Sequence, residues 1–83
     1  MASVYSEEYQ NVIKSLRKAR IEKGISQQHL ADALGRPQSF IAKVENGERR
    51  LDIVEFVYVA RLLSLNPATI IGKIPIKHEP LDA

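Results

Sequence analysis

The sequence contains no cysteine and no tryptophan, and it has only one methionine among its 83 residues. Without cysteine, neither disulfide bonds nor thiolate metal sites can stabilise the fold, and this composition is compatible with a reducing cytosol. The opening residues, MASVYSEEYQ, lack the basic and apolar segments of a secretory signal, and no apolar run approaches the length of a membrane span. We therefore expect a cytoplasmic protein without membrane association, built as one small domain.

Charge is nearly balanced overall, with a formal net charge of +2, but it is unevenly distributed along the chain. The segment 14–50 contains nine Lys or Arg and four Asp or Glu, whereas the rest contains three basic and six acidic residues. Such a basic segment indicates either a polyanion partner or an ordinary solvated surface, because phosphate neutralisation supplies much of the affinity for nucleic acids. The motif inside this segment favours the first interpretation.

The segment 26–47, SQQHLADALGRPQSFIAKVENG, contains two short amphipathic helical patterns joined by a tight turn. Ser26 can cap the first helix, and Gly35 follows its last apolar residue, where a helix end often needs positive φ. Pro37 fits the first position of the second helix, because that position needs no N–H donor. The second helix, at about 37–45, keeps polar residues on its outer face. This pattern predicts a helix-turn-helix whose second helix reads base edges.

Three further helices are expected around this motif. Ser6 can cap a helix that ends near Gly24, and Asp52 can cap one that runs to about Leu63. Asn66 caps a short fifth helix, which predicts an all-α fold of five helices. The expected core residues are Val12, Ile13, Leu16, Leu30, Ala31, Leu34, Ile41, Val44, Phe56, Val59, Ala60, Leu63, Ile70 and Ile71.

The ends of the chain differ from this helical region. Residues 1–5 are expected to form a flexible N-terminus, residues 6–72 the helix-turn-helix domain, and residues 73–83 an extended tail. The tail, KIPIKHEPLDA, has two prolines and no helical period. Its residues Ile74 and Ile76 could lie against the helix that begins after Asp52.

The expected helix at 52–63, DIVEFVYVARLL, has more apolar residues than one buried stripe requires. A helix that is apolar on most sides is buried on most sides, and a chain of this size has little left to cover the second side. A homodimer would cover it, and the chain's own tail is the competing explanation. The predicted dimer interface consists of Ile53, Val54, Val57, Tyr58 and Arg61.

Taken together, these segments resemble the Cro/C1-type helix-turn-helix family, also called XRE. The resemblance extends over about residues 13–71 and rests on LRKAR, GISQQHLADALG, IAKVENG and LSLNPATII. It implies a lambda-repressor-like, five-helix DNA-binding domain. By size and layout the chain is similar to small phage repressors, Cro-like proteins and controller proteins of restriction–modification systems.

The resemblance also implies roles for individual residues. Gln38 matches a glutamine whose amide can pair with adenine N6 and N7, and Arg20 and Glu45 match a buried ion pair. The implied base-reading residues are Gln38, Ser39, Ala42 and Lys43. The implied phosphate-binding residues are Gln27, Gln28, Arg36, Asn46, Gly47, Arg49 and Arg50, with Asn46 and Gly47 acting through backbone N–H groups.

Two residues depart from the family pattern. Pro37 lies where relatives more often have a Ser or Thr cap, so the reading helix could enter the groove at a shifted angle. Phe40 lies where a smaller or polar residue is usual, and it either contacts DNA or packs inward. We favour inward packing, because large aromatic side chains are usually buried.

These features predict a homodimeric, sequence-specific regulator of transcription, a repressor or autoregulator, that binds a roughly palindromic operator in double-stranded DNA. No catalytic motif, cofactor, metal cluster or small-molecule effector is expected, since His29 and His78 are far apart and no HExxH or P-loop occurs. The alternative is a protein-interaction module, such as an antitoxin or anti-repressor partner, that uses the same fold as a scaffold. RNA binding is less favoured, because no exposed aromatic platform is evident.

Overall fold

A computed structural model describes residues 6–82 of the chain. The expected flexible segment 1–5 and the last residue of the tail lie outside the described residues. Within the described range the fold is all-helical, without strands, as the sequence predicts. The helices are α1 (Glu7–Glu22), α2 (Gln27–Leu34), α3 (Gln38–Glu45), α4 (Ile53–Leu62) and α5 (Pro67–Gly72).

Four of the helices begin at polar residues that cap them as predicted. Ser6, Ser26 and Asn66 each accept a backbone N–H from the first turn of the helix that follows. Asp52 forms a full capping box with Glu55: its carboxylate accepts the Glu55 N–H, while Glu55 accepts the Asp52 N–H. These bonds satisfy backbone donors that a helix leaves unpaired, and each such cap stabilises its helix by about 1 kcal/mol.

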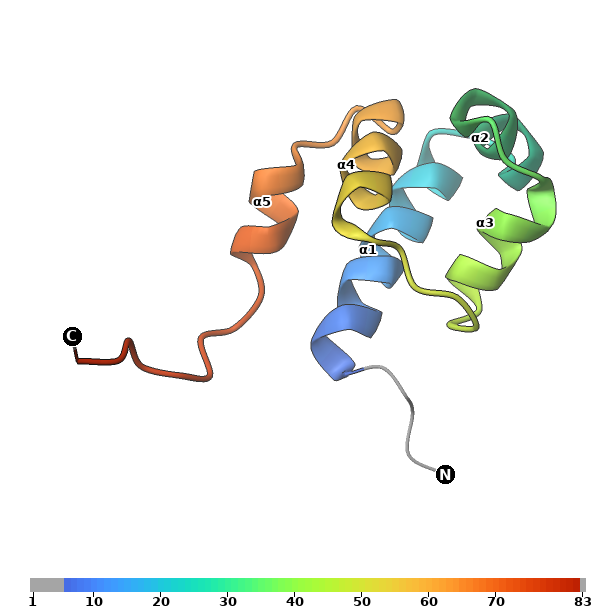
Figure 1. Cartoon of the computed structure of the whole chain (residues 1–83). Helices are drawn as coiled ribbons and strands as arrows, with labels where there is room; N and C mark the ends of the chain where they lie inside the picture. Colours follow the sequence, from blue (N-terminus) through green and yellow to red (C-terminus); the bar gives the residue numbers. More distant parts are fainter. Residues whose placement is uncertain (1–5, 83) are drawn as a thin grey trace.

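The helices enclose one apolar core (Figure 1). Helix α3 packs on α2 and α1, α4 packs on α2, and α5 lies on the other side of α4 from the α2–α3 pair (Figure 1). The α2–α3 pair thus forms one edge of the molecule. The buried apolar residues are Ile13, Leu16, Leu30, Ala31, Phe40, Ile41, Val44, Leu51, Phe56, Val59, Ala60, Leu63 and Ile70.

Helix α4 has a buried side and an exposed apolar side. Phe56, Val59 and Ala60 are buried in the core. Ile53 and Tyr58 are 72% and 57% exposed. Because successive helical residues are turned by about 100°, the five predicted interface residues lie together on the outward half of α4. We call this surface, formed by Ile53, Val54, Val57, Tyr58 and Arg61, the outer face of α4.

The end of the chain differs in part from the expected packing. Ile70 is buried, but Ile71 is exposed, because the six-residue helix α5 turns only one side toward the core. The segment 73–82 contains neither helix nor strand. Ile76 is almost fully exposed and does not cover α4, so the predicted packing of this residue is wrong.

An ion pair links the tail to the first helix. The Lys77 ammonium lies 2.9 Å from a carboxylate oxygen of Glu8. This hydrogen bond lowers the pKa of Glu8 and raises the pKa of Lys77. Both groups face solvent, so the pair holds the tail near α1 only weakly.

Candidate nucleic-acid interface

The turn between α2 and α3 follows from its local sequence, with one difference from the prediction. Gly35 has φ +75°, which lets the Arg36 N–H reach back to the Ala31 carbonyl at 2.9 Å. Pro37 is extended (φ −64°, ψ 152°), and α3 begins at Gln38. The sequence prediction placed Pro37 inside the helix; instead, its carbonyl accepts the Phe40 N–H at 2.9 Å, as an N-cap residue does. Pro37 supplies no side-chain cap.

Helix α3 turns its polar residues outward. Gln38, Ser39 and Lys43 are exposed and Ala42 is half-buried, so the four implied base-reading residues share one side of the helix. The opposite side contains the buried residues Phe40, Ile41 and Val44. The first turn of α3 therefore presents the Gln38 amide and the Ser39 hydroxyl to solvent. The next turn presents the Lys43 ammonium group on the same side.

A chain of amide hydrogen bonds fixes how Gln38 faces outward. Gln38 Nε2 donates to Gln27 Oε1 at 2.6 Å, and Gln27 Nε2 donates to Glu45 Oε1 at 2.9 Å. Because a carboxylate only accepts, Glu45 determines which end of the Gln27 amide faces it, and Gln27 in turn orients Gln38. Gln38 retains its carbonyl oxygen and one N–H, which are the acceptor and donor that an adenine edge requires.

The same carboxylate holds the motif to α1. Arg20 donates to both oxygens of Glu45, from Nε at 2.7 Å and from Nη2 at 3.0 Å, and both side chains are buried. Its Nη1 donates to the Ile25 carbonyl at 2.8 Å, and Arg17 lies 3.7 Å from the same carboxylate. The end of α3 is thus fixed relative to α1 and α2 by a bidentate pair, the strong form of this interaction.

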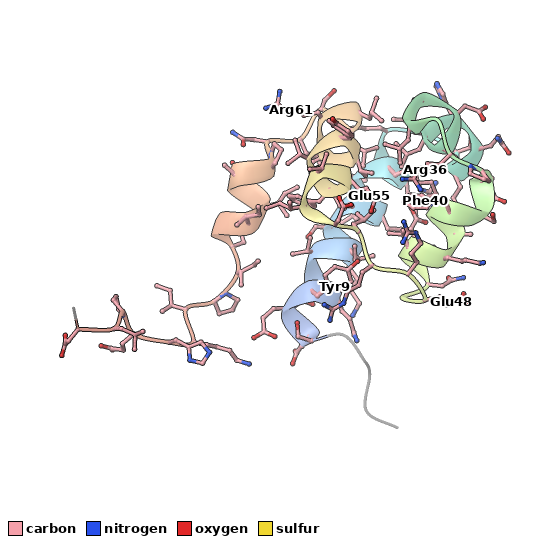
Figure 2. All side chains as sticks on the ribbon, viewed as in Figure 1. Tyr9, Arg36, Phe40, Glu48, Glu55 and Arg61 are labelled. Carbon is pink, nitrogen blue, oxygen red and sulfur yellow. The ribbon has the colours of Figure 1, made fainter. Side chains whose placement is uncertain are left out.

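Two of the implied phosphate ligands meet at a carboxylate that sequence reasoning did not assign to the site. Arg36 and Arg49 donate to Glu55 Oε2 at 2.9 Å and 3.2 Å. Both guanidinium groups also lie over the Phe40 ring, 4.7 Å and 4.6 Å from its centroid. Phe40 is buried beneath them, so its inward packing is confirmed. We call Arg36, Arg49, Phe40 and Glu55 the arginine cluster; Figure 2 labels Arg36, Phe40 and Glu55.

The signal for Glu55 in the sequence was its spacing from Asp52, which matches a capping box. That spacing accounts for the hydrogen bond of one carboxylate oxygen, Glu55 Oε1, which accepts the Asp52 N–H. The partners of the other oxygen lie 19 and 6 residues away along the chain. No local pattern indicates them.

Other implied phosphate ligands have neighbours of their own. Gln28 donates to Asp32 at 2.7 Å on the exposed side of α2. The Arg50 guanidinium lies 5.5 Å from the centroid of the Tyr9 ring. The Tyr9 hydroxyl in turn accepts the Leu51 N–H, so the loop after α3 is held against α1.

The loop at Asn46 and Gly47 differs from what the resemblance implies. The Asn46 N–H donates to the Ala42 carbonyl at 3.0 Å, and the Gly47 N–H donates to the Val44 carbonyl at 3.1 Å. The backbone of this loop thus closes the end of α3, and both donors implied for a phosphate are already in hydrogen bonds. In this conformation both N–H groups therefore have acceptors within the chain.

A family model described as helix-turn-helix, HTH_3, matches residues 16–70, which include α2 and α3. The chain belongs to this family. The suspected XRE-type helix-turn-helix is thereby confirmed. Comparison with curated protein sequences gives no match.

Several solved structures are similar to this chain. An XRE-family like protein from Pseudomonas syringae pv. tomato is 45% identical, with a TM-score of 0.76 over 81% of this chain and 82% of that one. The restriction-modification controller protein C.AhdI from Aeromonas hydrophila is 30% identical, with a TM-score of 0.69 over 80% of this chain and 98% of that one. A mutant of the controller protein C.Esp1396I, at 24% identity, shares the fold, with a TM-score of 0.73 over 86% and 90%.

The HTH_3 match supports the coarse class of a DNA-binding regulator of transcription for this chain. Among the described residues, no group of three or more His, Cys, Asp or Glu could hold a metal ion. In the same part of the chain, every helix is too short or too polar to cross a membrane.

Proposed function

We propose that this HTH_3 protein binds double-stranded DNA as a homodimer and inserts α3 of each subunit into the major groove. The orientation of Gln38 carries this proposal, because its amide is held by Gln27 with one acceptor and one donor facing outward. Ser39, Ala42 and Lys43 would contact neighbouring bases from the same side of α3. A symmetric dimer requires a roughly palindromic operator with half-sites about one helical turn apart, ~34–36 Å.

The dimer would form through the outer face of α4. The residues of this face are exposed except Val57, which is half-buried. An apolar surface of this kind, unpartnered in the single chain, is typical of a protein–protein interface. A two-fold interface uses the same surface on both subunits, so one face is sufficient.

The biological role that this DNA-binding function supports best is transcriptional repression or autoregulation. This role agrees with the expected cytoplasmic location. C.AhdI, 30% identical to this chain, is described as a restriction-modification controller protein. Control of this role would follow protein concentration, partner binding or proteolysis rather than a small ligand.

Phosphate contacts would surround α3. Arg36, Arg49 and Arg50 lie at or beside the loops that flank this helix, with Gln27 and Gln28 in the first turn of α2. At the end of α3 we assign the contact to the exposed side chain of Asn46 and not to backbone N–H groups, since those are already bonded.

Titration of the full chain against DNA at several salt concentrations tests this function. Release of counterions makes the affinity of a DNA-binding protein fall steeply with salt, and a specific regulator protects a symmetric site. The exposed apolar side of α4 also suits the competing role, a protein-interaction module that uses the fold as a scaffold. Such a module would show neither the salt dependence nor the protected site.

Replacing Arg50 by alanine should weaken binding to all DNA sequences about equally. A phosphate contact contributes affinity without reading sequence, so its loss should reduce the slope of log K against log salt by about 1. Filter binding at four or more salt concentrations measures this slope. Lys73→Ala is the matched control, because Lys73 follows α5, on the other side of α4 from α3 (Figure 1). Equal slopes for the two variants would remove Arg50 from the contact set.

Replacing Gln38 by alanine should cost on the order of 1–3 kcal/mol at one position of each half-site and relax discrimination there. The lost amide is the group that would pair with adenine. Competition between the operator and variants with single base changes measures the discrimination. An unchanged profile would show that Gln38 does not read a base.

A further inference from the structure

The charged members of the arginine cluster come from three separate segments. Arg36 comes from the turn before α3, Arg49 from the loop after it, and Glu55 from the first turn of α4. Both arginines donate to one atom, Glu55 Oε2, and both lie over the Phe40 ring. Two groups of like charge are thus held side by side by a shared carboxylate and a shared ring.

The two oxygens of Glu55 have separate partners. Oε1 accepts the Asp52 N–H at 2.9 Å and completes the capping box of α4. Oε2 accepts from both arginines, Arg36 at 2.9 Å and Arg49 at 3.2 Å. The Glu55 side chain is 11% exposed, and a buried carboxylate is stabilised when charged partners and hydrogen bonds occupy its oxygens, as the two arginines do here. The cap alone does not require a negative charge, because glutamine also serves at this position of a capping box.

The arginines themselves stay available to a ligand. Their side chains are 44% and 43% exposed, although each makes a hydrogen bond to Glu55. A guanidinium has five N–H donors, so each arginine retains donors after that bond. Paired guanidinium groups suit the two free oxygens of a phosphodiester. Because the pair is already ordered, binding loses less side-chain entropy than it would with two free arginines.

We propose that Glu55 is a positioning residue that holds Arg36 and Arg49 as a paired clamp for one phosphate of the DNA backbone beside α3. This inference rests on the proposed DNA-binding function and adds the part played by Glu55. According to this inference, the acidic residue Glu55 increases the affinity of the protein for DNA, which is a polyanion. Electrostatics alone predicts the opposite sign, since removing a carboxylate makes the surface more positive.

The sign of the effect can be measured with a pair of matched variants. Glu55→Gln and Asp52→Asn each remove one negative charge from the first turn of α4, and both new residues are good capping residues. Only the first change removes the carboxylate that holds the arginines. The full chain of each variant is titrated against DNA selected for the wild-type protein, at several salt concentrations and with the folded fraction measured by thermal unfolding.

We expect Glu55→Gln to bind about tenfold more weakly than the wild type, with a salt slope lower by about 1, because one phosphate contact is lost. Asp52→Asn should bind equally or more tightly, with an unchanged slope. If Glu55→Gln binds as tightly as Asp52→Asn, the positioning role is overturned.

A second comparison separates positioning from a general effect on the fold. In a chain that carries both Arg36→Ala and Arg49→Ala, adding Glu55→Gln should leave the affinity unchanged or raise it slightly, because the groups it positions are gone and only the loss of a negative charge remains. A further loss in that background would show that Glu55 acts through α4 itself and would overturn the inference. A wild-type chain that binds no DNA would instead overturn the proposed function, and this inference with it.

Discussion

Tyr58→Glu should convert the protein into a folded monomer whose affinity for its operator is about 10²–10⁴-fold weaker. This is the range by which joining two binding sites raises affinity without new contacts. Tyr58 is 57% exposed on the outer face of α4, so a charge there is tolerated in the monomer and costly in an apolar interface. Val57 would be a poorer choice, because it packs against the core and its replacement would disturb the fold.

Sedimentation equilibrium measures the mass of this variant, and a thermal melt checks that it is folded. Ile21→Glu is the matched control: Ile21 is an exposed apolar residue of α1, outside the outer face of α4. This control should remain a dimer with nearly wild-type affinity. If Tyr58→Glu sediments as a dimer, the interface lies elsewhere on the molecule.

Glu45→Ala should reduce the free energy of unfolding by about 3–5 kcal/mol, the usual cost of removing one partner of a buried ion pair. The change leaves the buried guanidinium of Arg20 without its bidentate partner and removes the acceptor that orients Gln27. Since 1 kcal/mol corresponds to about 4–8 °C in Tm for a small domain, the melting temperature should fall by well over 10 °C. Calorimetry or circular dichroism measures both quantities.

Glu48→Ala provides the control for this prediction. Glu48 is exposed in the loop after α3, and its replacement should change stability by less than about 0.5 kcal/mol. A loss of DNA affinity in Glu45→Ala without any loss of stability would mean that Glu45 acts mainly on recognition, either by orienting Gln27 and Gln38 or by contacting DNA, and is not mainly structural. A small effect on both would mean that the pair is not important for the fold.

Local patterns explain why so much of the fold could be predicted. The caps at Ser6, Ser26, Asp52 and Asn66 depend on hydrogen bonds between residues two or three apart, so residue type and spacing are sufficient to indicate them. The period of apolar residues likewise indicates which side of each helix is buried. Helix α5 was the exception, because six residues are too few to define a side, and Ile71 proved exposed.

The candidate site was predicted less completely, because its bonds join distant segments. Gln27 and Glu45 are 18 residues apart, and Arg36 and Glu55 are 19 apart. Spacing in the sequence carries no information on such contacts. The polar side of α3 could be predicted from its period, whereas the orientation of Gln38 depends on these long-range bonds.

Phe40 illustrates the same limit. As an isolated departure from the family pattern it could contact DNA or pack inward, and the sequence favours inward packing without deciding it. In the folded chain it is buried under two guanidinium groups that a carboxylate from α4 holds in place. An unusual residue in the reading helix is thus explained by a cluster whose other members lie outside that helix.

Selection of bound DNA from a random-sequence library by the full chain is the most direct test of the central claim, that a symmetric pair of α3 helices reads the major groove. We predict an enriched inverted repeat whose half-sites are centred about 10–10.5 bp apart, as two helices related by a two-fold axis require. Enrichment of no sequence, or of a single asymmetric site, would contradict the account.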